Sequence, residues 1–157
     1  MHRFRAAIEA RDVDAAVALL TEDVEFRSPV VFSPYRGRDP AAVLLHAVAR
    51  IFDDFRYTRE IGDSDGRDHA LVFQARIGDR RVEGCDFLHS NQDGMIDELV
   101  VMIRPLSGAL ALAEAMQAQL TKPEAINVPD EVQHGRFGHS LAETTTPDAN
   151  ASARRRT

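Results

Sequence analysis

The segment from Arg80 to Pro105, RRVEGCDFLHSNQDGMIDELVVMIRP, predicts two antiparallel strands joined by a tight turn. The turn is the tetrapeptide at residues 91–94, Asn-Gln-Asp-Gly, because these residue types tolerate the backbone conformations that tight turns need. The second strand should end at Pro105, which has no N–H to donate to a neighbouring strand. Side chains alternate between the two faces of a strand. One face of the first strand is therefore predicted to hold Val82, Gly84, Asp86 and Leu88.

Asp86 is the residue of this hairpin that needs an explanation. It shares a strand face with Val82 and Leu88, so we expect it to point into the protein. A buried carboxylate is costly unless it has a partner. Asp86 is either an acid or hydrogen-bond donor that faces a pocket, with Gly84 beside it leaving room for a ligand, or a structural carboxylate bonded to the backbone or to an arginine such as Arg104.

The second strand contains an apolar run on both of its faces, at residues 99–103. Leu99, Val101 and Ile103 are expected to line the interior. Val100 and Met102 would then face water in a monomer, and exposed apolar strand surface usually marks an interface. The sequence therefore predicts a homodimer that forms through the outer face of the sheet.

Composition narrows the class of protein. The chain has 157 residues, of which 44% are hydrophobic and 28% charged, which is typical of a globular domain. A net charge of −6 argues against binding to nucleic acid, and the single cysteine cannot form an internal disulfide. No apolar run reaches the ~20 residues of a membrane span. Without the apolar core of a signal peptide near Met1, we expect a cytoplasmic location. No histidines have metal-ligand spacing, so neither a metal nor another cofactor is expected.

Helices and strands are predicted on both sides of the hairpin. Asp12 can cap the second of two short helices, or the second half of one bent helix, over residues 3–20. Asp39-Pro40 predicts the start of a long helix, with Asp39 as the capping residue and Pro40 at the first helical position. A strand is expected over residues 24–28, a loop with Phe32 and Tyr35 over residues 29–38, further strands near residues 57–61 and 69–77, and a last helix over residues 106–121. The apolar stripe of the long helix would be Leu44, Ala47, Val48, Ile51 and Phe55, and that of the last helix Leu106, Leu110, Ala113 and Met116.

The composition changes near the end of the chain. Residues 123–157 contain few large apolar side chains, three prolines, a run of threonines and an arginine triplet. Segments of this kind bury too little apolar surface to fold alone. The sequence thus predicts one domain over residues 1–122, followed by a largely disordered C-terminal tail over residues 123–157.

The order of these elements resembles the nuclear transport factor 2-like superfamily, which includes SnoaL-like and ketosteroid-isomerase-like proteins. The resemblance covers about residues 3–120. It rests on residues 4–30, FRAAIEARDVDAAVALLTEDVEFRSPV, and residues 84–101, GCDFLHSNQDGMIDELVV. It implies an α+β cystatin-like cone, in which a curved, mixed or antiparallel sheet wraps around the long helix and leaves a pocket at its open end.

The resemblance also bears on chemistry. Ketosteroid isomerases use a tyrosine on the first helix, an aspartate base before the proline that follows the first strand, and a protonated aspartate in the hairpin. The matching positions here are Phe4, Ser28 and Asp86. Phenylalanine cannot donate a hydrogen bond and serine is no base without a partner, so steroid isomerisation by that mechanism is not expected. The aspartate of related epoxide hydrolases falls on Val101. SnoaL-type cyclases rely mainly on one acid/base carboxylate, a role that Asp86 can fill.

Two functional hypotheses follow. The first is a SnoaL-like protein that binds a small apolar molecule and acts as an acid/base isomerase or cyclase through Asp86. The second is a non-catalytic dimeric module for ligand binding or interaction. Under both, the partners are a small apolar molecule and a second copy of the chain, with no nucleic acid and no membrane. The predicted pocket residues are Phe4, Ser28, Phe32, Tyr35, Leu99, Val101 and Ile103.

Overall fold

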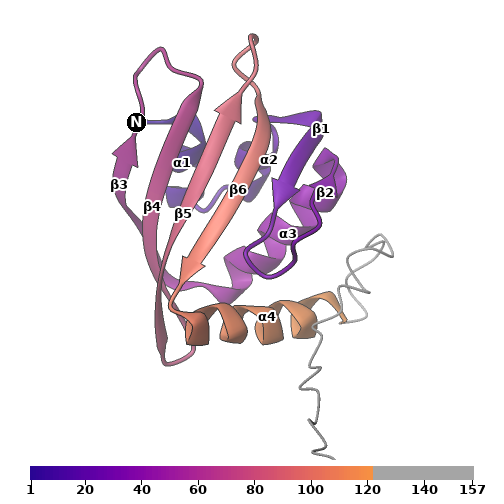
Figure 1. The fold of residues 1–157 in the computed structure, drawn as a ribbon, viewed down its shortest axis with the longest axis vertical. Coiled ribbons are helices and arrows are strands. Elements are labelled where there is room, and N and C mark those ends of the chain that lie inside the picture. Colours follow the sequence, from indigo (N-terminus) through magenta and orange to yellow (C-terminus); the bar gives the residue numbers. More distant parts are fainter. Residues whose placement is uncertain (122–157) are drawn as a thin grey trace, which may run out of the picture.

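A curved six-stranded sheet forms the centre of the computed structural model, which describes residues 1–121. The strand order is β2-β1-β6-β5-β4-β3; β1 and β6 run parallel, and the other neighbours run antiparallel. Helices α1, α2 and α3 cover one face of the sheet, and α4 crosses its end (Figure 1). The predicted α+β cone is confirmed. The elements are α1 (Arg3–Glu9), α2 (Val13–Val17), β1 (Leu20–Arg27), β2 (Tyr35–Arg36), α3 (Arg38–Ile51), β3 (Asp53–Ile61), β4 (Asp68–Ile77), β5 (Arg80–Ser90), β6 (Ile96–Arg104) and α4 (Leu106–Leu120).

The β5–β6 hairpin forms as predicted. The Gly94 N–H donates to the Asn91 carbonyl at 3.1 Å, and Gly94 has a φ of 76°, which glycine adopts without strain. The register places Asp86 between Leu71 of β4 and Val101 of β6. Val82, Asp86 and Leu88 are all buried, so the predicted inward face of β5 is correct.

The N-terminal region contains two helices rather than one bent helix. The Asp12 side chain accepts a hydrogen bond from the Ala15 N–H at 2.9 Å and so caps α2, as predicted. The following strand begins at Leu20, four residues earlier than expected, and ends at Arg27. Ser28 therefore lies just after the strand.

Both ends of α3 differ from the prediction. The N-cap is Gly37, with a φ of 108° and no side-chain hydrogen bond, so the expected capping by Asp39 is wrong. Asp39 instead lies in the first turn, where its charge complements the helix dipole. The helix ends at Ile51, and Phe55 belongs to β3. Phe55 still has an apolar environment, because its ring packs against that of Phe73 of β4, with the ring centroids 5.0 Å apart.

The buried face of α4 also differs from the prediction. Leu106 and Leu110 are exposed, whereas Met116 is buried as predicted, together with Gly108 and Leu112. The helix lies close to the sheet at Gly108, where an added Cβ would lie 2.5 Å from Val82 Cγ1. Apolar residues occupy most of the circumference of α4, so their spacing does not by itself show which face of the helix packs against the sheet.

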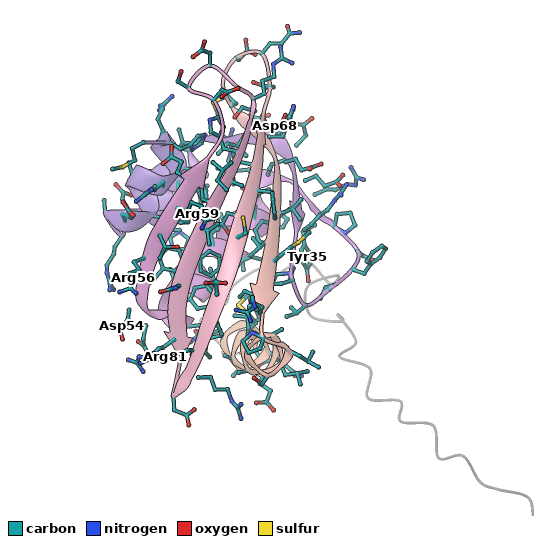
Figure 2. All side chains as sticks on the ribbon, turned by 60° about the vertical axis from the view of Figure 1, so that its left-hand side comes forward. Tyr35, Asp54, Arg56, Arg59, Asp68 and Arg81 are labelled. Carbon is teal, nitrogen blue, oxygen red and sulfur yellow. The ribbon has the colours of Figure 1, made fainter. Side chains whose placement is uncertain are left out.

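The free edge of the sheet at β3 carries charged side chains. Asp54, Arg56 and Arg59 are exposed on this strand (Figure 2). Charges on an edge strand oppose pairing with a strand of another molecule. Within residues 1–121 no helix is long and apolar enough to cross a membrane. The predicted tail, residues 123–157, lies outside the described residues.

Candidate active site

A buried tyrosine–aspartate pair lies on the inner face of the sheet, between β3 and β5. The Tyr57 hydroxyl, from β3, donates to Asp86 Oδ2 at 2.6 Å across the intervening strand β4. Tyr57 is 6% exposed and Asp86 is 7% exposed. Each group therefore has a partner, which removes much of the cost of burying it. The sequence analysis did not identify Tyr57, because nothing local shows that residues 29 positions apart meet across a third strand.

Burial dominates the electrostatics of this pair. It raises the pKa of Asp86 from 3.8 to about 7, and the hydrogen bond from Tyr57 offsets only part of that increase. The pKa of Tyr57 is well above 10, first because of burial and then because of the negative charge on Asp86. Near neutral pH, Asp86 therefore exchanges between a protonated acid and a carboxylate. The protonated form can donate a hydrogen bond to a ligand.

The alternative in which Arg104 neutralises Asp86 is wrong. Arg104 Nη1 lies 3.4 Å from Glu83 Oε1 at the surface. Arg5 of α1 lies on the tyrosine side of the pair, with its guanidinium carbon 5.9 Å from the centroid of the Tyr57 ring. Asp86 is thus bonded to a neutral hydroxyl, and its pKa is raised rather than lowered.

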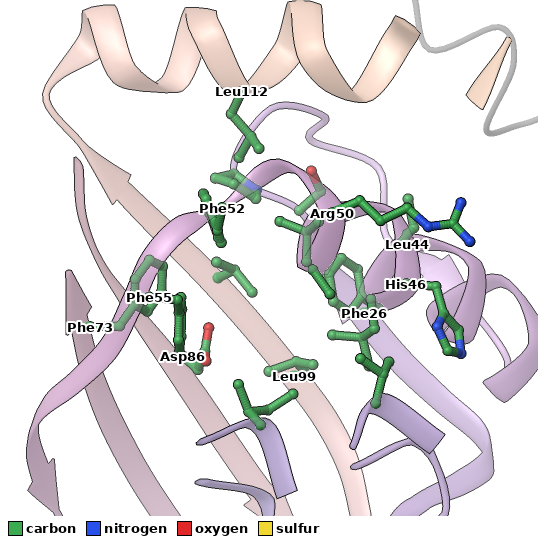
Figure 3. Close-up of a pocket in the computed structure, with 18 of the residues that line it drawn as sticks. Phe26, Leu44, His46, Arg50, Phe52, Phe55, Phe73, Asp86, Leu99 and Leu112 are labelled. Carbon is green, nitrogen blue, oxygen red and sulfur yellow. The ribbon is translucent and has the colours of Figure 1, made fainter. Parts of the chain in front are cut away.

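Asp86 faces a cavity of about 290 Å³ that lies between the sheet and the helices. Figure 3 shows its carboxylate beside Phe55 and Phe73. Most of the wall is aromatic or aliphatic, with few polar groups, as is usual for sites that bind small molecules. The lining residues are Phe4, Ile8, Glu9, Arg11, Val13, Phe26, Ser28, Pro29, Val30, Leu44, Leu45, His46, Val48, Ala49, Arg50, Phe52, Phe55, Tyr57, Phe73, Asp86, Leu99, Val101, Leu112 and Met116.

The structure brings some of the predicted pocket residues to this cavity and not others. Phe4, Ser28, Leu99 and Val101 line it together with Asp86. The other three predicted residues, Phe32, Tyr35 and Ile103, do not. Phe32 is fully exposed, Tyr35 is buried against Phe26 through the β1–β2 pairing, and Ile103 packs against the core beyond the cavity wall.

Gly84 does not leave room for a ligand, contrary to the prediction. A Cβ at this position would lie 2.2 Å from Phe73 Cζ and 2.7 Å from the Met102 carbonyl oxygen. The aromatic ring of Phe73 occupies the space above the glycine. Phe73 forms one wall of the cavity with Phe52 and Phe55, and their ring centroids are 5.0–5.8 Å apart.

The remaining polar groups near Asp86 limit the chemistry. Ser28 Oγ accepts a hydrogen bond from the Val30 N–H at 3.2 Å, a local turn contact that does not activate the hydroxyl. Phe4 has no donor. The hydroxyl of this site therefore comes from Tyr57 on β3, not from the first helix. Within residues 1–121 no three or more side chains are grouped as a metal site would require.

Comparison with known proteins identifies the family. The model of the SnoaL-like domain family matches residues 1–99. The chain belongs to this family. An uncharacterised protein with a cystatin-like fold from Silicibacter pomeroyi is similar to this SnoaL-like protein, with 35% identity over 78% of this chain and 85% of that chain and a TM-score of 0.73. Among proteins with curated descriptions, none matched the sequence.

The SnoaL-like protein belongs to the wider nuclear transport factor 2-like superfamily, and two further solved structures are similar to it. A steroid delta-isomerase from Pseudomonas aeruginosa is 39% identical over 73% of this chain and 84% of that chain, with a TM-score of 0.70. A putative polyketide cyclase from Pseudomonas putida is 20% identical over 68% of this chain and 89% of that chain, with a TM-score of 0.55. The second likeness concerns the fold alone.

Proposed function

We propose that this SnoaL-like protein binds a small, mainly apolar molecule with a carbonyl oxygen, and that Asp86 performs acid/base chemistry on it as in an isomerase or cyclase. The observation that carries this proposal is the Tyr57–Asp86 pair, which faces an apolar cavity. The similarity to a protein described as a steroid delta-isomerase supports the same reaction class. Phe4 and Ser28 make the donor and base arrangement different from the one that steroid isomerisation uses.

The chemistry follows from the pKa of Asp86. A carboxyl group with a pKa of about 7 can give and take a proton near neutral pH. Protonated Asp86 can donate to a carbonyl oxygen and so make the neighbouring C–H bonds more acidic. When Asp86 is ionised, its carboxylate can take a proton from a carbon next to the carbonyl and return that proton to the substrate, and the Tyr57 hydroxyl stabilises the carboxylate through its hydrogen bond. The apolar wall excludes water, which strengthens each of these interactions.

Binding of a simple ketone should therefore depend on pH. We expect the affinity for 2-acetylnaphthalene to fall about tenfold as the pH rises through about 7, because ionised Asp86 no longer donates and repels the carbonyl oxygen. Asp86→Asn keeps a donor at every pH, so its affinity should be nearly constant. Isothermal calorimetry at several pH values measures both. Equal pH dependence in the two proteins would contradict the role of Asp86.

A non-catalytic binding protein is the second candidate, and the absence of a base at Ser28 favours it. Proton NMR in D₂O separates the two, because acid/base catalysis should exchange the methyl protons of bound 2-acetylnaphthalene for deuterium faster than buffer does. Asp86→Asn should remove this acceleration. Binding without accelerated exchange would support the second candidate.

We also propose that two copies pair through the outer face of the sheet, which no helix among residues 1–121 covers (Figure 1). The register places Cys85 opposite Met102, and Phe87 opposite Val100. Phe87 is 41% exposed and Met102 is 58% exposed. Polar pairs flank this apolar patch: His89–Asp97 at one end and Arg104–Glu83 at the other. An apolar centre with a polar rim is typical of an interface.

The pairing is tested by the double substitution Val100→Glu with Met102→Glu, which should give a folded monomer because two buried charges per copy are too costly. Light scattering coupled to size exclusion gives the mass. Leu106→Glu with Leu110→Glu is the matched control, since these exposed leucines lie on α4 and not on the sheet, and it should remain dimeric. A wild-type monomer at high concentration would refute the pairing.

A further inference from the structure

Cationic side chains lie at the edge of the cavity, on the side opposite Asp86. His46 and Arg50 lie four residues apart on α3, so they occupy one face of the helix. Figure 3 shows both on the side of the pocket away from Asp86, with the guanidinium of Arg50 directed outward. Arg11, which follows α1 with a φ of 58°, also lines the cavity. A ligand that reaches from Asp86 to this edge would place its far end near Arg50, in the same cavity that Arg11 lines.

The charges at this edge are not balanced. Glu9 is paired with Arg5 at 3.1 Å, and Asp14 is paired with His46 at 2.9 Å. Both of these carboxylates are therefore engaged. Arg11 and Arg50 have neither an ion pair nor a side-chain hydrogen bond to any residue in the range 1–121. Two uncompensated positive charges thus border an apolar cavity, in a chain whose net charge is −6.

We propose that the ligand is amphipathic: its carbonyl end lies at Asp86, and an oxyanion at its other end is bound by Arg50 and Arg11. This inference rests on the proposed function, because it assigns the second end of the same ligand. A guanidinium matches the geometry of a carboxylate, sulfate or phosphate and can donate two parallel hydrogen bonds to it. The apolar walls between the two ends would hold the body of the molecule.

The simpler explanation of Arg50 is that its aliphatic stem covers apolar surface while its charged end stays in water. This explanation predicts no preference for an anionic ligand. The two explanations therefore differ in a measurable quantity, which is the affinity ratio between two probes of the same shape that differ by one anionic group.

The probes are 2-acetylnaphthalene and 6-acetyl-2-naphthoic acid, which carries a carboxylate at the end opposite its ketone. Binding is measured by calorimetry at pH 6, where Asp86 is mostly protonated. We expect the acid to bind about tenfold tighter at low salt, and this ratio should shrink at high salt because exposed charges are screened. Sulfate and phosphate esters of 6-acetyl-2-naphthol show which oxyanion is preferred.

Single substitutions identify the residues that cause the tighter binding of the acid. Arg50→Gln should lower the acid-to-ketone affinity ratio to about one or two, and Arg11→Gln should lower it partially. Arg80→Gln is the matched control, because Arg80 is exposed on the β4–β5 hairpin away from the cavity, and it should leave the ratio unchanged. Circular dichroism confirms that each variant is folded.

The outcomes separate this inference from the function on which it rests. Equal binding of the two probes to the wild type, or a ratio that Arg50→Gln does not change, would overturn the oxyanion site and leave the proposed function standing. Absence of binding by both probes would overturn both proposals. A ratio that depends on Arg50 and on salt supports the amphipathic ligand.

Discussion

Asp86→Asn should make the protein more stable at pH 8 but not at pH 4. The pKa of Asp86 is about 7 in the folded protein and 3.8 ordinarily, so the folded chain holds a proton that the unfolded chain releases. This carboxyl therefore contributes stability below about pH 4, and that contribution is lost as the pH rises through about 7. A shift of this size corresponds to about 4 kcal/mol. An asparagine side chain does not ionise between these pH values, so its contribution to stability does not depend on pH.

The stability of the variant relative to wild type should thus rise by about 4 kcal/mol between about pH 4 and pH 8. At low pH the variant should be slightly less stable, because one amide N–H is left without a partner in an apolar site. The charged groups on the other side of Tyr57, Arg5 and Glu9, are common to both proteins and cancel in the difference.

Urea unfolding at several pH values and one fixed protein concentration measures this difference. Glu114→Gln, at an exposed position on α4, is the control for the removal of one surface carboxylate. A flat or falling curve for Asp86→Asn would show that the carboxyl is ionised in the folded protein at neutral pH. A gain in stability with a loss of acid/base function would be typical of a site that is kept for its chemistry.

Gly84→Ala should destabilise the protein by about 3 kcal/mol, although alanine ordinarily suits the interior of a strand better than glycine. The new Cβ would lie 2.2 Å from Phe73 Cζ and 2.7 Å from the Met102 carbonyl oxygen, so both the ring and the neighbouring strand would have to move. Phe73 is fully buried within the aromatic wall, which leaves its ring little room. Thermal and urea unfolding give the change in free energy.

A double substitution tests the cause of this effect. Phe73→Leu removes the atom nearest to the new Cβ and should by itself destabilise the protein through a cavity. Combined with Gly84→Ala, the total loss should be smaller than the sum of the two single losses, because the clash and the cavity offset each other. Additive losses would mean that the ring does not limit the space at Gly84. The contact with Met102 O would remain in either case.

Local sequence determined the hairpin and the orientation of Asp86. The turn at residues 91–94 has the residue types that a tight turn requires, and Pro105 ends the second strand where its N–H is missing. Once the strand is fixed, its alternation decides which side chains point inward. The resemblance of two segments to the superfamily then predicted the cone-shaped fold and, with it, a pocket.

Local sequence was less informative where two periodicities overlap. Phe55 continues the helical stripe that starts at Leu44. It also lies two residues before Tyr57, so in a strand the two side chains share one face. Packing against Phe73 decides between them. Similarly, α4 is apolar around most of its circumference, and the absence of a side chain at Gly108 selects the face that meets Val82.

The sequence by itself therefore determined the class of fold and the buried carboxylate, because turns, prolines and strand alternation act over a few residues. Only the tertiary structure decided what surrounds that carboxylate. Tyr57 reaches Asp86 because β3 and β5 lie on either side of β4, and Phe73 fills the space over Gly84 for the same reason. The pKa of Asp86 depends on these long-range contacts, since burial is a property of all the elements that pack around a group and not of its own strand.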